Sequence, residues 1–200
     1  MQTVKLVSLF VVLLTATNLH AQKQKYEVTS GDLSFLKKVE KIKIIYDYSG
    51  LMIGELKESD YTAKRMADKD LGEPGGGELW LKKWVGDRSN FYEPRFEELW
   101  NKYIKKIPAG RNIESNVIMN VHTTWIEPGF YTMMRYGSRP SLVNLTITFT
   151  NNGEQAAVIT IINSPGVSGM TDSFDAANRI AESYAKAAKT LANYVLKVYK

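Results

Sequence analysis

Residues that could perform covalent catalysis are few in this sequence, and their spacing does not complete a catalytic motif. Gly166-Val167-Ser168-Gly169 lies between a predicted strand and a predicted helix, which is the position of the nucleophilic serine in many hydrolases. That motif needs a glycine two residues after the serine, but the residue there is Met170. A general base is also required, and His122 is the only histidine besides His20. We interpret this segment as a loop that leads into a helix.

Sites for anions, metals and cofactors are poorly supported. Gly75-Gly76-Gly77 precedes a predicted helix, where backbone N–H groups can bind an anion, but the lysine and hydroxyl residue of a phosphate-binding loop are missing. The chain has no cysteine, which excludes thiol chemistry, iron–sulfur clusters and cysteine-ligated zinc. The sequence also lacks a calcium-loop motif. We predict no metal and no cofactor, and we interpret the three glycines as a hinge.

Carboxylates remain as potential acid–base groups. Glycan hydrolysis requires two carboxyl groups that converge on one cleft. Glu93, Glu97 and Glu98 lie on one predicted helix, but adjacent residues of a helix point in different directions. A solvated helix face therefore explains these three glutamates more simply than a catalytic pair.

Aromatic and methionine side chains around the turn Glu127-Pro128-Gly129 are the best candidates for a contact surface. The turn follows the end of a predicted strand, and functional residues concentrate on such connections. Methionine-rich surfaces also adapt to different partners. The alternative is a buried extension of the sheet. The candidate contact residues are Trp125, Phe130, Tyr131, Met133, Met134 and Tyr136.

Hydropathy patterns predict the elements that position these residues. Asn151-Asn152-Gly153 predicts the turn of a hairpin, and the aromatic residues between Trp80 and Tyr103 have the spacing of a helical core face. Alternation of apolar and polar residues predicts strands at 42–48, 117–125, 143–150 and 157–162, with a short strand within 130–136. Helical patterns cover 60–106, in two or three pieces, and 172–199.

These elements predict an α+β fold. Each predicted strand has one apolar and one polar face, so helices are needed on one side of the sheet only. The long amphipathic segment 172–199 is expected to be the main helix of that layer, with Arg179 on its polar face. We therefore expect a two-layer domain with a mainly antiparallel sheet of about four or five strands and helices on one face.

The N-terminus predicts export. Lys5, the apolar run 6–14 and the small residue Ala21 match a secretory signal peptide that is cleaved near Ala21. The run is shorter than the roughly 20 residues that span a membrane, so no transmembrane segment is expected in the mature chain. Residues 22–38 are then a polar lead-in, and residues 39–200 a single α+β domain. An exported chain without cysteine favours the bacterial periplasm or the cell exterior.

The charge distribution argues against a nucleic-acid partner. The net charge of +5 is modest, and the basic residues are dispersed among acids, as where Lys64 and Arg65 lie near Asp68 and Asp70. Nucleic-acid-binding proteins instead gather basic residues on one face or along one stripe. We therefore expect a solvated surface and no nucleic-acid partner.

Part of the sequence resembles known exported proteins. The turn Trp125-Ile-Glu127-Pro128-Gly129-Phe130, the strand from Pro140 to Phe149 and the alanine-rich C-terminal segment resemble small exported proteins of unknown function from Gram-negative bacteria. More distantly, the order of elements is similar to the α/β domains of envelope assembly proteins, such as the N-terminal domain of the Tol-system propeller protein or the curli secretion lipoprotein. The resemblance implies an envelope role, and no functional residue carries over from it.

Together, these observations predict an exported, non-catalytic binding or envelope-assembly module whose partner is an envelope protein or a glycan. The alternative is a carboxylate-based carbohydrate-active or other envelope hydrolase, so enzymatic activity is uncertain but less expected. A third hypothesis is a structural subunit, and its oligomeric state is left open. That subunit would associate through the polar sheet residues Asn120, His122, Asn144, Thr146 and Thr148.

Overall fold

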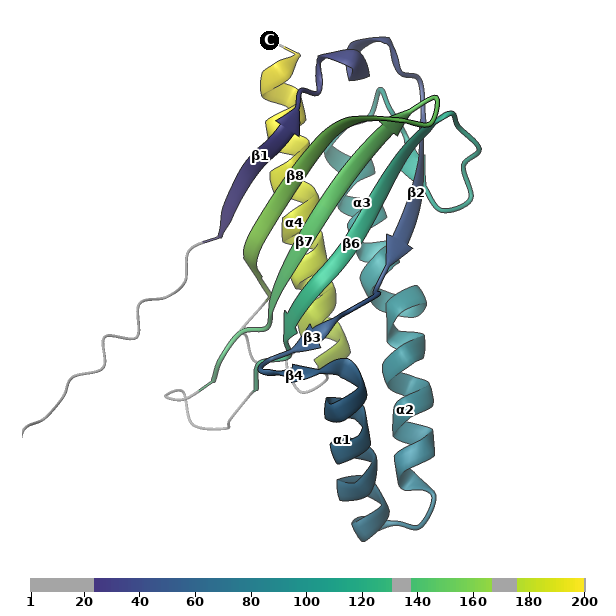
Figure 1. Cartoon of the computed structure of the whole chain (residues 1–200), viewed down its shortest axis with the longest axis vertical. Helices are drawn as coiled ribbons and strands as arrows, with labels where there is room; N and C mark the ends of the chain where they lie inside the picture. The colour runs from purple at the N-terminus through teal and green to yellow at the C-terminus, as the bar shows by residue number, and fades with distance from the viewer. Residues whose placement is uncertain (1–23, 131–137, 167–175, 200) are drawn as a thin grey trace, which may run out of the picture.

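The computed structural model describes residues 24–130, 138–166 and 176–199. Within these ranges the chain forms one sheet with a helical layer on one face and a helical hairpin that extends beyond the end of the sheet (Figure 1). The strands are β1 (Lys25–Gly31), β2 (Ile42–Asp47), β3 (Met52–Ile53), β4 (Leu56–Lys57), β5 (Ala109–Gly110), β6 (Val117–Glu127), β7 (Leu142–Asn151) and β8 (Glu154–Pro165). The helices are the 3-10 helix η1 (Ser34–Lys38), α1 (Glu58–Gly72), α2 (Gly76–Asp87), the π-helix η2 (Arg88–Tyr92), α3 (Glu93–Tyr103) and α4 (Ala176–Val198).

The sheet is mixed rather than mainly antiparallel. Its strands follow the order β1-β8-β7-β6-β2-β5, and β3 pairs with β4 and with the far end of β6. The β1-β8, β8-β7 and β7-β6 pairs are antiparallel, whereas β2 pairs in parallel with both β6 and β5. Parallel neighbours require a long crossover connection, and α1, α2 and α3 supply it between β2 and β6.

The predicted sheet of four or five mainly antiparallel strands is therefore wrong, since eight strands form a mixed sheet. The missed strands have a common physical reason. An edge strand needs no apolar face, and β1 is exposed at every residue except Val28, which is half-buried. The strands β3, β4 and β5 are two residues long, so alternation cannot reveal them.

The β7-β8 hairpin and the C-terminal helix are formed as predicted. β7 pairs with β8 around Asn152 and Gly153, which both have positive φ angles. One face of the sheet carries the buried side chains, including Met119, Val121 and Ile147, and α4 packs its apolar stripe against that face. Many stripe residues are alanines, which allow a close approach to the sheet.

One residue of α4 departs from the expected polar face. Arg179 is buried rather than solvated, and its guanidinium donates hydrogen bonds to the carbonyl oxygens of Pro128 and Gly129. The main-chain carbonyl of Arg179 also accepts a hydrogen bond from Ser141 Oγ. The helix is thus fastened to the turn after β6 by polar contacts that no hydropathy pattern can indicate.

The α1-α2 hairpin extends away from the end of the sheet (Figure 1). Its two helices hold each other through aromatic contacts, since the ring centroid of Tyr61 in α1 lies 5.4 Å from that of Trp84 and 6.1 Å from that of Trp80 in α2. None of the residues of α1 is fully buried. No helix in the described ranges is long and apolar enough to cross a membrane.

Candidate functional site

The predicted contact surface is only partly described by the structure. Trp125 belongs to β6 and is half-buried, and its indole N–H donates to the carbonyl oxygen of Gly54 at 2.9 Å. Phe130 is 45% exposed, and the guanidinium carbon of Arg139 lies 5.8 Å from the centre of its ring. The other four candidates, Tyr131, Met133, Met134 and Tyr136, lie outside the described residues. The contact surface therefore stays a prediction.

Of the two glycine-containing segments considered above, the structure describes residues 75–77 but only the first residue of 166–169. Val167, Ser168 and Gly169 also lie outside the described residues. At Gly75-Gly76-Gly77, the backbone N–H of Gly77 donates to Asp70 Oδ1 at 2.9 Å, and that of Gly76 donates to the Glu73 carbonyl at 2.9 Å. These donors at the start of α2 are therefore occupied within the protein rather than open to an anion.

The helix carboxylates considered as acid–base groups belong to ion pairs. Arg111 donates to Glu93 Oε2 at 2.6 Å and to Glu97 Oε1 at 2.8 Å. Glu98 pairs with Arg95 on the helix surface. Glu93 is only 8% exposed, and its second oxygen accepts a hydrogen bond from the Tyr48 hydroxyl at 3.3 Å. The contacts of Glu93 and Glu97 give these two glutamates a structural role in joining α3 to the residues that follow β2 and β5.

A group of tyrosines adjoins Glu93, of which Tyr92 and Tyr184 are fully buried and Tyr46 and Tyr48 half-buried. The hydroxyl of Tyr46 donates to the Glu93 carbonyl oxygen at 3.1 Å, and the hydroxyls of Tyr184 and Thr123 lie 2.6 Å apart. The ring of Tyr92 stacks on that of Tyr184 at 5.4 Å. Burial raises the pKa of Tyr46, of Tyr48 and of Tyr184 above the ordinary tyrosine value, because the phenolate would lose its hydration.

These raised pKa values predict a loss of stability in alkali. Tyrosines of the unfolded chain ionise near pH 10, whereas these tyrosines of the folded chain keep their protons to higher pH. Between the two pKa values, ionisation therefore stabilises only the unfolded state. The free energy of unfolding should fall above about pH 10 by roughly 1.4 kcal/mol per pH unit for each such tyrosine. Tyr184→Phe should reduce the slope above pH 10 by that amount and leave the slope below pH 9 unchanged. Urea denaturation at a series of pH values measures both slopes, and equal slopes above pH 10 would contradict the prediction.

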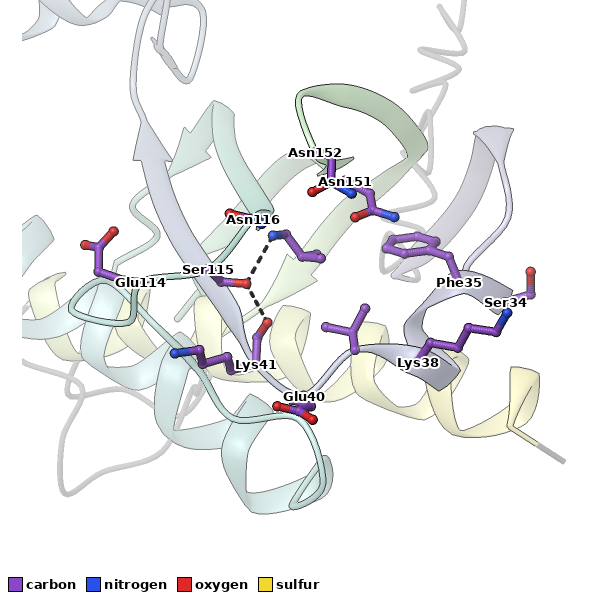
Figure 2. A pocket seen from close by; sticks show the side chains of 12 residues that line it. Ser34, Phe35, Lys38, Glu40, Lys41, Glu114, Ser115, Asn116, Asn151 and Asn152 are labelled. Atoms are coloured by element: carbon purple, nitrogen blue, oxygen red, sulfur yellow. Dashed lines mark hydrogen bonds between the residues drawn. The ribbon is translucent and has the colours of Figure 1, made fainter.

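A polar pocket lies at the end of the sheet opposite the α1-α2 hairpin. Its volume is about 890 Å³. Four segments meet around it: η1 with the residues that follow it, the loop before β6, the start of β6 and the turn of the β7-β8 hairpin (Figure 2). It is lined by Ser34, Phe35, Lys38, Val39, Glu40, Lys41, Glu114, Ser115, Asn116, Val117, Asn151 and Asn152. We call it the asparagine pocket.

Main-chain hydrogen bonds fix the walls of the asparagine pocket. Ser115 Oγ donates to the Lys41 carbonyl oxygen at 2.8 Å and accepts from the Val117 N–H at 3.0 Å (Figure 2). The Asn152 N–H donates to the Asn116 carbonyl oxygen at 3.0 Å, which joins the hairpin turn to the loop before β6. Asn152 has a φ of 52°, a conformation that asparagine tolerates better than most residues. The walls are therefore held by main-chain groups together with the Ser115 hydroxyl, and the Asn116 and Asn152 side chains take no part in these bonds.

Three asparagine side chains group along one wall of this pocket, and Phe35 lies beside them (Figure 2). Within the described ranges, no hydrogen bond engages the side-chain amides of Asn116, Asn151 or Asn152. Each amide can donate two hydrogen bonds and accept others. Phe35 is half-buried, and its ring meets the buried ring of Phe149 edge-on at 6.3 Å, so its orientation is fixed by the core. The pocket thus combines free amides with an anchored aromatic ring.

The pocket carboxylates are placed for solvation rather than for acid catalysis. Glu114 is paired with Lys43 at 2.9 Å, and its side chain is 84% exposed. Glu40 is also exposed. A glycosidase acid is kept protonated by an apolar or otherwise desolvated environment, which an exposed glutamate lacks. Neither Glu40 nor Glu114 therefore has the environment of such an acid.

No local signal in the sequence marks the asparagine pocket, because its members come from positions 34–41, 114–117 and 151–152. The pattern at Asn151 and Asn152 predicts only a hairpin turn. A positive-φ asparagine next to a second asparagine is common in turns and does not predict a site. In the described part of the chain, no cluster of three or more histidines and carboxylates is arranged to hold a metal ion.

Comparisons with known proteins add little. No protein-family model matches the sequence, and no curated protein matches it. Among solved structures, this chain is similar to PelC from Paraburkholderia phytofirmans, solved as a dodecamer, with a TM-score of 0.37 and 14% identity over 82% of this chain and 96% of that chain. A TM-score this low does not establish a common fold, so neither the assembly nor the role of that protein transfers. These findings do not bear on the resemblance to the Tol-system and curli proteins, which stays a prediction.

Proposed function

We propose that the mature chain is an exported, non-catalytic envelope module that binds a glycan in the asparagine pocket. The observation that carries the proposal is the set of three unengaged asparagine amides, within the described ranges, beside the anchored ring of Phe35. A sugar hydroxyl both donates and accepts hydrogen bonds, and an amide offers both functions in return. The apolar C–H face of a sugar ring packs against an aromatic side chain. The signal-like residues 1–21 support export.

The charge of the pocket supports an uncharged glycan. Lys38 and Lys41 are balanced in number by Glu40 and Glu114, so the lining has no excess of either sign. A strongly anionic ligand would be repelled by the two glutamates, and a strongly cationic ligand by the two lysines. The volume of about 890 Å³ lies near the upper end of the usual range for small-ligand pockets, about 300–1,000 Å³, and suits an oligosaccharide of a few residues.

Removal of the asparagine amides should weaken glycan binding. Mature protein is purified from the periplasmic fraction, checked by intact mass for a start at Gln22, and applied to an array of neutral and N-acetylated oligosaccharides. We expect binding to at least one oligosaccharide, and at least a tenfold loss of affinity when Asn116→Ala and Asn152→Gly are combined, because each lost hydrogen bond contributes about 1 kcal/mol. Glycine at 152 keeps the positive φ, so the turn is preserved.

Asn112→Ala is the matched control, because Asn112 is an exposed asparagine close in sequence that does not line the pocket. Its affinity should equal that of the unchanged protein. An array without any bound oligosaccharide, or a bound one whose affinity is the same for the double variant, would reject the glycan pocket. Intact mass that includes residues 1–21 would reject export.

A further inference from the structure

A second concave surface is lined by residues of η1, of the segment after α3 and of the C-terminal end of α4, at the same end of the molecule. It has a volume of about 470 Å³. Val39 lines both this surface and the asparagine pocket, so the two are neighbours. We call it the lysine groove. Its lining is Leu36, Lys37, Val39, Tyr103, Ile104, Lys105, Lys106, Ile107, Leu196 and Tyr199.

The floor of the lysine groove is apolar and rigid. Leu36, Ile104 and Ile107 are core residues with 0–3% of their surface exposed. The loop that carries Ile107 is fixed by the Trp100 indole, which donates to the Ile107 carbonyl oxygen at 2.9 Å. Leu196 at the edge is 38% exposed, so apolar surface remains uncovered in the protein alone. Covering such surface with an apolar group is favourable.

The rim of the groove is positively charged. Lys37, Lys105 and Lys106 line it, and Lys189 Nζ lies 5.5 Å from the centre of the Tyr103 ring. In the described part of the chain, none of these four lysines forms an ion pair with a carboxylate, and no acidic residue lines the groove. The asparagine pocket, by contrast, carries both signs. The groove therefore offers uncompensated positive charge that a negatively charged partner would complement.

Two tyrosines complete the amphipathic character of the groove. Tyr103 and Tyr199 both line it, and the Tyr199 hydroxyl donates to the Leu36 carbonyl oxygen at 2.9 Å. Tyrosine rings and lysines are enriched where proteins meet the interface between lipid and water. Lysine binds phosphate as a point charge without the fixed fork geometry of arginine, which suits headgroups that move laterally.

We propose that the lysine groove docks the protein on an anionic lipid surface, with headgroup phosphates at the lysines and the first acyl carbons against Leu196 and the half-buried rings of Tyr103 and Tyr199. An acidic peptide would match the charge, but its backbone N–H groups would need hydrogen-bond acceptors, and a lysine side chain has none. The lining side chains are only lysine, tyrosine and aliphatic residues. An acyl chain needs no such partners. The proposal is independent of the glycan pocket and adds a membrane contact to the envelope role.

Co-sedimentation with lipid vesicles tests the proposal. The mature protein should sediment with vesicles of phosphatidylglycerol and phosphatidylcholine and stay in solution with phosphatidylcholine alone. Each lysine near an anionic surface contributes about fivefold to binding. The triple variant Lys37→Glu, Lys105→Glu and Lys106→Glu should therefore lose roughly 100-fold or more in partition. Leu196→Ser should lower the binding that persists at high salt, where electrostatic attraction is screened.

A charge-matched control separates the groove from net charge. Lys64→Glu, Lys69→Glu and Lys82→Glu change three exposed lysines of the α1-α2 hairpin and alter the net charge equally. Their partition should fall only a few-fold. Equal losses in the two triple variants, equal binding to both vesicle types, or capture of a poly-glutamate peptide instead of vesicles would each overturn the proposal. The double variant Asn116→Ala and Asn152→Gly should sediment with vesicles like the unchanged protein. The vesicle assay therefore tests the lysine groove independently of the glycan pocket.

Discussion

Replacing Arg111 by alanine is expected to lower the free energy of unfolding by about 3 kcal/mol. Arg111 is the partner of two glutamates of α3, and Glu93 is the more buried of them. Without the guanidinium, the Glu93 carboxylate stays in a site with little water and keeps, among the residues that the structure describes, only the hydrogen bond from the Tyr48 hydroxyl. A buried charge that loses its partner costs more than the pair contributed. Urea denaturation at pH 7 measures the loss.

Glu93→Gln in the Arg111→Ala background distinguishes this cause from lost packing. The amide carries no charge, so the double variant should recover a large part of the lost stability. Arg95→Ala is the matched control, because Arg95 also joins two glutamates, but these are more exposed: the side chains of Glu98 and Glu182 are 57% and 28% exposed, against 11% for Glu93. It should cost less than about 1 kcal/mol. Equal losses for the Arg111 and Arg95 variants, or no recovery with glutamine, would contradict the assignment.

Replacing Gly166 by alanine is expected to be at least as damaging, with a loss of about 3 kcal/mol or more. An added methyl group would overlap the Arg179 carbonyl oxygen and Ser141 Oγ. Neither atom can move freely, because Ser141 Oγ donates to that same carbonyl and the Gly166 N–H donates to the Ser141 carbonyl at 2.7 Å. The substitution forces α4 away from the ends of β7 and β8.

Thermal unfolding and urea denaturation measure this effect. Gly86→Ala in α2 is the control, since its added methyl group would have only the flexible Asn90 side chain near it, at 3.5 Å. Alanine is also the better helix former, so this variant should be neutral or more stable by up to about 1 kcal/mol. A Gly166→Ala protein with unchanged stability would show that the contact between α4 and the sheet is looser than its geometry indicates.

Local patterns determined the elements that have strong periodicity. The alternation along 143–150 and 157–162 and the intervening Asn151-Asn152-Gly153 predict the β7-β8 hairpin, because neighbouring residues decide which face is apolar and where the chain turns. The apolar stripe of α4 and the helical aromatic residues are predicted for the same reason. Most of the stripe is buried, as are Phe96 and Trp100, whereas Phe91 is 38% exposed.

Only the tertiary structure decided the sheet order, the parallel pairing of β2 with β6 and the position of β1 on the edge. These depend on contacts between residues far apart in sequence, and an exposed edge strand such as β1 leaves no apolar signature. The burial of Arg179 has the same origin, since its partners Pro128 and Gly129 belong to another segment.

The sequence by itself therefore determined which segments become the hairpin and the long helix, because periodicity acts within a single element. The tertiary structure alone assembled the asparagine pocket and the lysine groove. Asn116 and Asn152 line the first of these surfaces, and Lys37, Lys105 and Lys106 line the second. These residues are far apart in sequence, and the residues around them show no repeating pattern. Such surfaces arise where the ends of separate elements converge, and the position of those ends is set by packing in the core rather than by the residues that line them.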